Sequence, residues 1–433
     1  MGFAGGAADR GSIHTPHGGY DVGARVQSVS ILYRNSQGKD VTHTSYSSRS
    51  VFKKCPRQFQ LERVHGWSDK SQRAAPLFGK CIEAGLQAYE ESGRVHEAGV
   101  KMFRRLWEEV KLTPDFERLI YTATETSWEQ LMKSGEQLML LYELKAPHLP
   151  IMKPLFQQRI RKTIFPGTNL CMLENVAVLD ILSFPPWDHK MLPKIDAPDD
   201  HALPAIAPAV RELIIDVKTA GKDFPTALVS LDPQLAEYAW QTRIPDVAFL
   251  WLVKCSHGFK RGSRVSLLRP VGALWGGWEG FVLDIADDDA GAPQVLAIGS
   301  YDALQKFEAV VKGVRGKALT AAKQNLIDTG HGDGSIITVS ASDVTKQRIQ
   351  FAAARLTEED MDEVGRSVAQ TTVEMVRAHE QDFYEKQPGV RFPSEKCGFC
   401  SMRFHCLHDA EGRDKNLTRR GEEWLDGIDQ ENE

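Results

Sequence analysis

The sequence lacks any run of apolar residues long enough to cross a membrane. A transmembrane helix needs about 20 predominantly apolar residues, so we expect no membrane partner. The N-terminus, Met1-Gly2-Phe3-Ala4-Gly5-Gly6, also lacks a basic region followed by an apolar one, which is the pattern of a secretory signal. A cytoplasmic protein is therefore expected.

The chain also lacks an excess of basic residues, since its net charge is −5. From Asp409 to Glu433 it holds nine acidic and four basic residues, so this segment alone carries −5 and the remainder is neutral. A neutral body can still carry a local basic channel. Charge therefore neither supports nor excludes a nucleic-acid partner.

The number of cysteines is odd, so they cannot all pair with one another. Seven cysteines in a chain without an export signal disfavour a disulfide framework. Cys397, Cys400 and Cys406 lie within ten residues in the pattern C-x2-C-x5-C. Three soft ligands this close together indicate a bound metal ion or metal cluster.

The fourth ligand of that group must come from elsewhere, and the candidates are Cys55, His405 and His408. A histidine would indicate a structural zinc ion, whereas Cys55 would complete a [4Fe-4S] cluster or an all-thiolate zinc site. The spacing does not separate these metals. Cys55 is favoured over the other cysteines because it ends a predicted helix and precedes Pro56. The other three lie in apolar runs and are interpreted as buried small hydrophobes: Cys81, Cys171 and Cys255.

Residues 213–219 predict a strand on which Asp216 and Lys218 point to the same face while Val217 turns into the core. A carboxylate can bind a hard divalent cation, and a neighbouring lysine can orient the attacking water and screen phosphate charge. Alone, this pattern is weak, because surface ion pairs often produce it.

Three further predicted elements carry polar side chains of interest. Asp180 lies in an apolar strand over residues 173–182, where an acid needs a partner or a metal. Glu83 lies on the flank of the apolar face of a helix over residues 71–89. A helix capped by Asp232 carries Gln234 and Tyr238 one turn apart.

The order of these elements predicts an α/β layer architecture. We divide the chain into a flexible N-terminal tail, a core in two parts separated by an insertion rich in Gly and aromatic residues, and an acidic tail. The N-terminal tail covers residues 1–45, and the acidic tail covers 409–433. The core covers 46–255 and 346–408, and the insertion between them covers 256–345.

Together these motifs resemble the RecB-like branch of the PD-(D/E)XK nucleases, and most closely its members with an iron-sulfur staple. The likeness covers roughly residues 46–255 and 346–406. It is carried by six segments in the same order: Tyr46-Ser47 to Cys55-Pro56-Arg57-Gln58-Phe59, Phe78 to Glu83, Asp180, Asp216-Val217-Lys218-Thr219, Gln234 to Tyr238, and Cys397 to Cys406.

The resemblance implies a restriction-endonuclease-like mixed sheet flanked by helices, which cuts DNA phosphodiester bonds with Mg2+ or Mn2+. It implies that Asp180 and Asp216 are metal ligands, with the backbone carbonyl of Val217 as a further ligand, and that Lys218 positions the water nucleophile. Gln234 and Tyr238 would contact DNA or support the site. The implied ligands of a [4Fe-4S] cluster are Cys55, Cys397, Cys400 and Cys406.

This sequence departs from the family at one position, because Glu83 stands where a metal-binding histidine is usual. A carboxylate is an adequate ligand for Mg2+, so metal preference can differ. The leading hypothesis is an exonuclease or DNA end-processing enzyme of repair, recombination or mobile-element DNA metabolism. It would act on single-stranded ends, with a helicase or recombination partner.

Two alternatives from other classes stand beside the nuclease hypothesis. One is a non-catalytic DNA-binding subunit that keeps the stapled fold. The other is an interaction protein stapled by zinc. The set of Asp180, Asp216 and Lys218 argues against the DNA-binding subunit, because a scaffold has no need of buried carboxylates. A colourless protein with stoichiometric zinc and no DNA affinity would indicate the interaction protein.

Overall fold

The computed structural model describes the chain from residue 31 to residue 419 with gaps. The described residues are 31–113, 116–121, 127–166, 173–193, 210–255, 258–271, 274–287, 291–312, 321, 325, 336–386, 397 and 400–419. The statements below concern these residues. Cys171, much of the Pro-rich segment 184–210 and most of the predicted N-terminal tail lie outside them.

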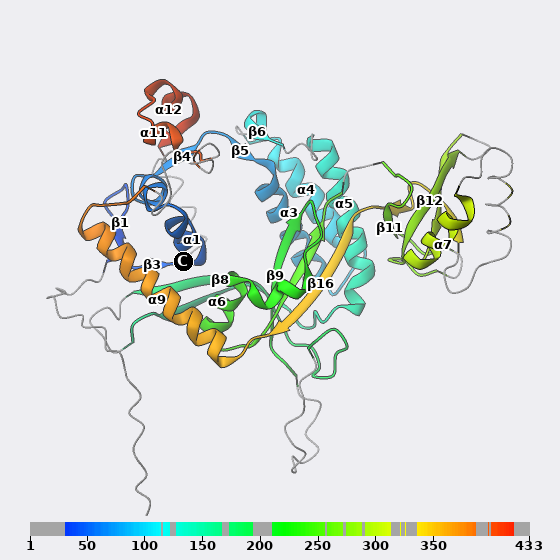
Figure 1. The fold of residues 1–433 in the computed structure, drawn as a ribbon, viewed down its shortest axis with the longest axis horizontal. Helices are drawn as coiled ribbons and strands as arrows, with labels where there is room; N and C mark the ends of the chain where they lie inside the picture. The colour runs from blue at the N-terminus through cyan, green and yellow to red at the C-terminus, as the bar shows by residue number, and fades with distance from the viewer. Residues whose placement is uncertain are drawn as a thin grey trace, which may run out of the picture.

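A six-stranded mixed sheet forms the centre of the molecule (Figure 1). Its strand order is β16-β10-β9-β8-β3, and β7 also pairs with β8. β9 runs parallel to β10, β3 runs parallel to β8, and the other pairs are antiparallel. The strands are β3 (His43–Thr44), β7 (Leu155–Thr163), β8 (Glu174–Ser183), β9 (Leu213–Ala220), β10 (Asp246–Val253) and β16 (Arg348–Arg355).

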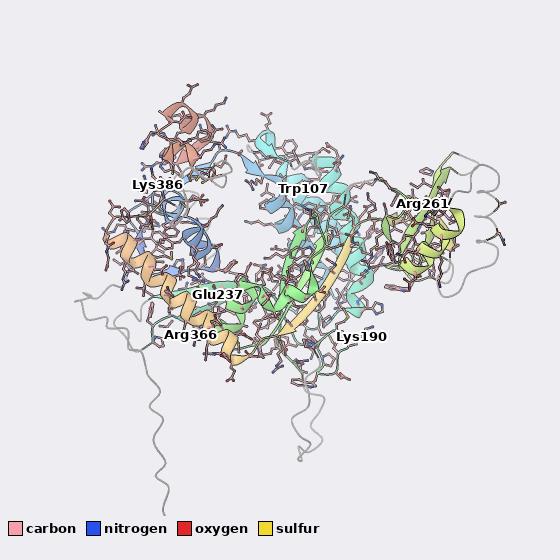
Figure 2. All side chains as sticks on the ribbon, viewed as in Figure 1. Trp107, Lys190, Glu237, Arg261, Arg366 and Lys386 are labelled. Carbon is pink, nitrogen blue, oxygen red and sulfur yellow. The ribbon has the colours of Figure 1, made fainter. Side chains whose placement is uncertain are left out.

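Helices cover both faces of this sheet, which explains why its central strands are almost continuously apolar. On one face the core joins β9 and β10 to α3 (Ala74–Glu91), α4 (Ala98–Val110) and α5 (Trp128–Lys145). On the other it joins them to α6 (Pro233–Thr242) and α9 (Glu358–Glu380). Trp107 of α4, labelled in Figure 2, is fully buried in the first core. The expected α/β architecture with a mixed sheet flanked by helices is confirmed.

Ordered structure begins before residue 46, earlier than predicted. Strands β1 (Tyr33–Arg34) and β2 (Asp40–Val41) pair with each other, and β3 joins the central sheet. Helix α1 (Tyr46–Lys54) begins after Ser45, because the Ser45 side chain caps it and Ser48 completes the capping box. α2 (Pro56–Phe59) and the π-helical turn η1 (Gln60–Val64) follow.

Short elements precede and follow α5. A 3-10 turn η2 (Phe116–Arg118) and the strand β6 (Leu119–Ile120) come before it. β6 pairs with β5 (Gln72–Arg73). The remaining short turns are η3 (Ala146–His148) and η4 (Thr226–Leu231). Within the described residues, no helix combines the length and the apolar composition that a membrane span requires.

The insertion forms a separate five-stranded antiparallel sheet that stands to one side of the central sheet (Figure 1). Its strand order is β14-β13-β12-β11-β15, and it encloses its own apolar core. The elements are β11 (Arg264–Leu267), β12 (Glu279–Asp287), β13 (Pro293–Ile298), α7 (Tyr301–Val311), β14 (Ile336–Ser340) and β15 (Val344–Thr345).

The segment after Cys406 folds back onto the N-terminal part of the chain. α11 (Arg403–Cys406) is followed by α12 (Ala410–Asn416) and β17 (Leu417–Arg419), which pairs with β4 (Trp67–Asp69). Leu61, Met402 and Leu417 form a small core there. Of the predicted acidic tail, residues 409–419 are therefore structured, and residues 420–433 lie outside the described residues.

Candidate active site

Two acids meet where strands β8 and β9 separate. Their antiparallel register ends at Ile181 opposite Ile215, so Asp180 and Asp216 occupy the next pair of positions. Like charges directly opposite each other are unfavourable in a ladder. Asp180 instead accepts a hydrogen bond from the Val217 backbone N–H at 2.8 Å through its Oδ2 atom. The point where the two strands separate thus holds a pair of acids, of which Asp216 is buried and Asp180 is partly buried.

Glu83 is brought to this pair by α3. Burial raises the pKa of Glu83 to about 7, and the charge of Asp180 adds to the rise. Burial likewise raises the pKa of Asp216 to about 8, again with a contribution from Asp180. Partial burial of the Asp180 carboxyl raises its pKa as well. Three acids from three elements therefore share one environment.

Lys218 supplies the positive charge next to these acids. Its Nζ atom lies 2.6 Å from Oδ2 of Asp216 and donates to Oε1 of Gln234 at 3.2 Å. Gln234 in turn donates to the Tyr238 hydroxyl at 2.6 Å. Burial lowers the pKa of Lys218, but the neighbouring carboxylates, Asp216 first, raise it by more. The predicted pairs Asp216–Lys218 and Gln234–Tyr238 thus form one chain of contacts.

Asp216 has unused acceptor capacity. Its side chain is 1% exposed, whereas Lys218 is 34% exposed. The Asp216 Oδ1 atom is buried and has no hydrogen-bond partner among the described residues. Oδ2 lies at ion-pair distance from Lys218 although it forms no well-directed hydrogen bond. A buried oxygen of this kind requires a further donor or a cation.

As the side chains stand, no group of three or more His, Cys, Asp or Glu residues in the described part of the chain has the arrangement of a metal site. This holds for the acids of the sheet and for the thiols. The carboxylate oxygens of the acids and the sulfur atoms of the thiols are nevertheless the kinds of atom that bind metals in proteins.

A buried ion pair beside the acids was not predicted. Arg49 of α1 pairs with Glu237 of α6, and both are nearly inaccessible to solvent. Asn175 of β8 accepts from Arg49 at 2.7 Å and donates to Glu237 at 3.0 Å. Glu237, labelled in Figure 2, lies on the helix that carries Gln234 and Tyr238. The one signal in the sequence was Glu237 itself, the one charged residue of α6.

The thiols predicted to share a site lie near one another. Burial raises the pKa of Cys400, and the charges of Cys406 and Cys55 raise it further. Burial also raises the pKa of Cys406, with contributions from Cys55 and Cys397. Cys55 is thus brought from the junction of α1 and α2 to the C-terminal cysteines. These four, with Cys81 and Cys255, form no disulfide.

The two histidine candidates differ in their surroundings. The His405 ring lies 4.4 Å from the Trp67 ring in an edge-on contact, and its buried Nε2 atom has no partner among the described residues. His408 has a positive φ of 56° at the end of α11. His405 therefore keeps a free nitrogen that a metal could use.

Comparison with known proteins identifies one family. Residues 43–148 match the PD-(D/E)XK nuclease superfamily. The matched segment, less than half of the chain, contains Cys55 and Glu83 and ends before Asp180, Asp216 and Lys218. No curated protein gives a significant match.

Among solved structures, the one described as "Crystal structure of SSO0001" is 12% identical with a TM-score of 0.20. The alignment covers 49% of this chain and 63% of that chain, so it spans less than two thirds of the other protein. A likeness this weak supports no statement about fold or activity. The matched segment and the mixed sheet flanked by helices support the presence, in this chain, of a PD-(D/E)XK nuclease superfamily domain with a restriction-endonuclease-like fold.

Proposed function

We propose that this protein is a deoxyribonuclease of the RecB-like branch that uses Mg2+ or Mn2+ and acts on single-stranded DNA ends. The observation that supports this proposal best is the convergence of Glu83, Asp180 and Asp216 beside Lys218. Burial raises the pKa values of these acids without a metal, and the charge of Asp180 adds to the rise in Glu83 and Asp216. A divalent cation would stabilise their ionised forms together.

The donor atoms of this site fit a hard cation. Asp180, Asp216 and Glu83 offer carboxylate oxygens, and Asp216 Oδ1 is the buried acceptor that lacks a partner. The Val217 N–H points toward Asp180, and the N–H and C=O of one strand residue point to the same side. The Val217 carbonyl therefore faces the acids, and we propose it as the fourth oxygen ligand of the cation. When bound, the cation supplies positive charge that stabilises the phosphate in the transition state.

The remaining contacts assign roles to the neighbouring side chains. Lys218 stays protonated because of Asp216, so we assign it to hold the water nucleophile and to screen phosphate charge. Gln234 accepts from Lys218 and donates to Tyr238, so it fixes where the ammonium points. The Arg49–Glu237 pair anchors the helix that carries both.

For the cysteines we propose a [4Fe-4S] cluster held by Cys55, Cys397, Cys400 and Cys406, with zinc as the alternative metal. The proximity of Cys55 to Cys400 and Cys406 supports four thiolate ligands. The unpartnered His405 nitrogen is what keeps a zinc site with one histidine open. Iron, sulfide and zinc analysis of the purified protein, with its visible absorbance, separates the two.

The activity test uses end-labelled single-stranded and double-stranded DNA with Mg2+, Mn2+ or EDTA. We expect cation-dependent cleavage that is lost in Lys218→Ala and retained in Asp362→Asn, a control at an exposed acid of α9. Wild-type activity in EDTA, or full activity of Lys218→Ala, would contradict the proposal. Tight DNA binding without cleavage under any cation would instead indicate a non-catalytic binding subunit.

A further inference from the structure

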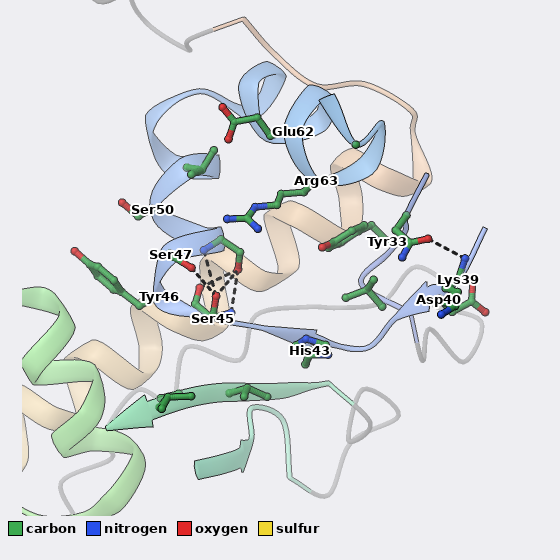
Figure 3. Close-up of a pocket in the computed structure, with 18 of the residues that line it drawn as sticks. Tyr33, Lys39, Asp40, His43, Ser45, Tyr46, Ser47, Ser50, Glu62 and Arg63 are labelled. Atoms are coloured by element: carbon green, nitrogen blue, oxygen red, sulfur yellow. Dashed lines mark hydrogen bonds between the residues drawn. The ribbon is translucent and has the colours of Figure 1, made fainter. Parts of the chain in front are cut away.

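A cavity of about 770 Å3 with a mixed polar and apolar lining adjoins the candidate active site (Figure 3). It lies between the start of α1, the turn η1 and strand β8, and Gln234 and Tyr238 also line it. Its volume is typical of pockets that enclose small organic ligands. It has room for a short piece of a single nucleic-acid strand and not for a duplex.

Lys39 and Arg63 are the lysine and arginine side chains that line this cavity, and Arg63 extends toward Ser45 and Ser47 (Figure 3). It lies in η1, a π-helical turn, and such turns are frequent at functional sites. Its Nε atom is buried and has no hydrogen-bond partner among the described residues. A guanidinium remains protonated, so this nitrogen needs an acceptor, and a phosphate oxygen is among the strongest.

The opposite wall of the cavity consists of the first turn of α1. The hydroxyls of Ser45 and Ser47 lie 3.0 Å apart there, and Ser45 caps the N–H of Ser48 at 3.3 Å. The N–H groups of Tyr46 and Ser47 precede the intrahelical ladder and point out of the helix start. Donors at the start of a helix favour a negative charge.

The two acids that also line the cavity already have partners. Asp40 accepts from Arg34 at 2.8 Å, and Glu62 accepts from Gln58 at 2.7 Å. Neither is therefore needed to balance Arg63. The wall that combines Arg63 with the start of α1 is thus the part of the cavity suited to an anion.

We propose that this cavity holds one nucleic-acid strand beside the reacting phosphate, and that Arg63 and the start of α1 bind one of its phosphate groups. The proposal rests on the proposed function, because it assumes that the strand enters the candidate active site. The bound group is either a terminal phosphate or an internal one, and the experiment below separates these sources.

The test measures binding of a fluorescein-labelled single strand of DNA by anisotropy in EDTA, where no cleavage occurs. Arg63→Gln removes the charge and should weaken binding roughly 10- to 100-fold, as for a lost charged hydrogen bond. The slope of log affinity against log salt should fall by about 0.7, the value for one phosphate contact on a single strand. Arg63→Lys should keep the slope. Arg105→Ala, at an exposed arginine of α4, should change neither.

A second variant separates binding from folding. Ser47→Asp places a negative charge in the first turn of α1, where it stabilises the helix but repels a phosphate. It should weaken DNA binding without lowering the melting temperature. The proposal would be overturned if both variants, Arg63→Gln and Ser47→Asp, bound DNA with an affinity within two-fold of wild type and with an unchanged salt slope.

The effect of Arg63→Gln on binding is compared between strands with and without a terminal phosphate, which identifies the phosphate that is bound. A loss confined to the phosphorylated strand assigns a terminal phosphate, and an equal loss on both assigns an internal one. Cleavage by the wild type with no effect of Arg63→Gln on binding overturns this inference and leaves the proposed function intact. Binding that depends on Arg63, without cleavage under any cation, would support this inference and contradict the proposed function.

Discussion

The acids around Asp216 and the thiols around Cys400 represent two ways in which distant residues can meet. The acids come from β8, β9 and α3, long regular elements packed in the largest core. The thiols come from a helix junction and from Cys397, Cys400 and Cys406, of which only Cys406 lies in the short helix α11, beside a small core of three buried residues. The first group is held by the fold, whereas the second has little core of its own.

This difference indicates different roles for the two groups. Strands in the centre of a buried sheet position side chains precisely, as catalysis requires. A cross-link between residue 55 and residues 397–406 instead limits the freedom of the unfolded chain. We therefore expect variants of the acids to lose activity and keep stability, and variants of the thiols to lose stability first.

The largest effect is expected for Cys55→Ser, which would remove the ligand that joins the two ends of the domain. Loss of a cross-link that closes so long a loop costs roughly 5 kcal/mol in the chain-entropy model. Denaturant unfolding and iron or zinc content measure it. Cys81→Ser, at a buried cysteine of α3, is the matched control and should keep its metal. Equal metal content in both variants would show that Cys55 is not a ligand of the metal.

Asp216→Asn should reduce cleavage by roughly a thousand-fold, at the upper end for loss of one transition-state contact. Because the pKa of Asp216 is raised to about 8, its carboxyl is largely neutral at pH 7 without metal. The amide is a close substitute for that form, so the melting temperature should hardly change. A variant that unfolds instead would show that the acids are structural.

Gln234→Leu should lower the cleavage rate by about ten-fold, which corresponds to about 1.4 kcal/mol, the range of one hydrogen bond. The substitution keeps the helix but removes the acceptor of Lys218. The effect should appear in kcat and not in KM, since the lysine acts on the water nucleophile. A change in KM alone would assign Gln234 to DNA binding.

The smallest effect concerns the pH dependence of stability without metal. The folded-state pKa values of Glu83 and Asp216 are raised to about 7 and about 8. The folded protein therefore binds more protons than the unfolded chain above pH 4.5, and this contribution to stability falls as pH rises toward 8. Added Mg2+ should raise the melting temperature more at pH 8 than at pH 6. In Glu83→Gln this difference should shrink.

Local patterns in the sequence predicted much of this arrangement. The two-fold alternation of residues 213–219 indicated that Asp216 and Lys218 share a face, and they lie 2.6 Å apart. The prediction that Asp232 caps the helix of Gln234 and Tyr238 is confirmed by its hydrogen bonds to the helix start. Such features depend on neighbours a few residues away, so sequence spacing is enough to reveal them.

The sequence by itself determined which strands and helices carry the acids, Lys218 and the thiols, because periodicity and capping are local. Only the tertiary structure decided that β8 and β9 separate at Asp180 and Asp216, that β17 pairs with β4, and that Arg63 enters a cavity beside α1. These features follow from strand register and packing between segments far apart in the chain. No local pattern encodes them, since many registers satisfy the same alternation of apolar residues.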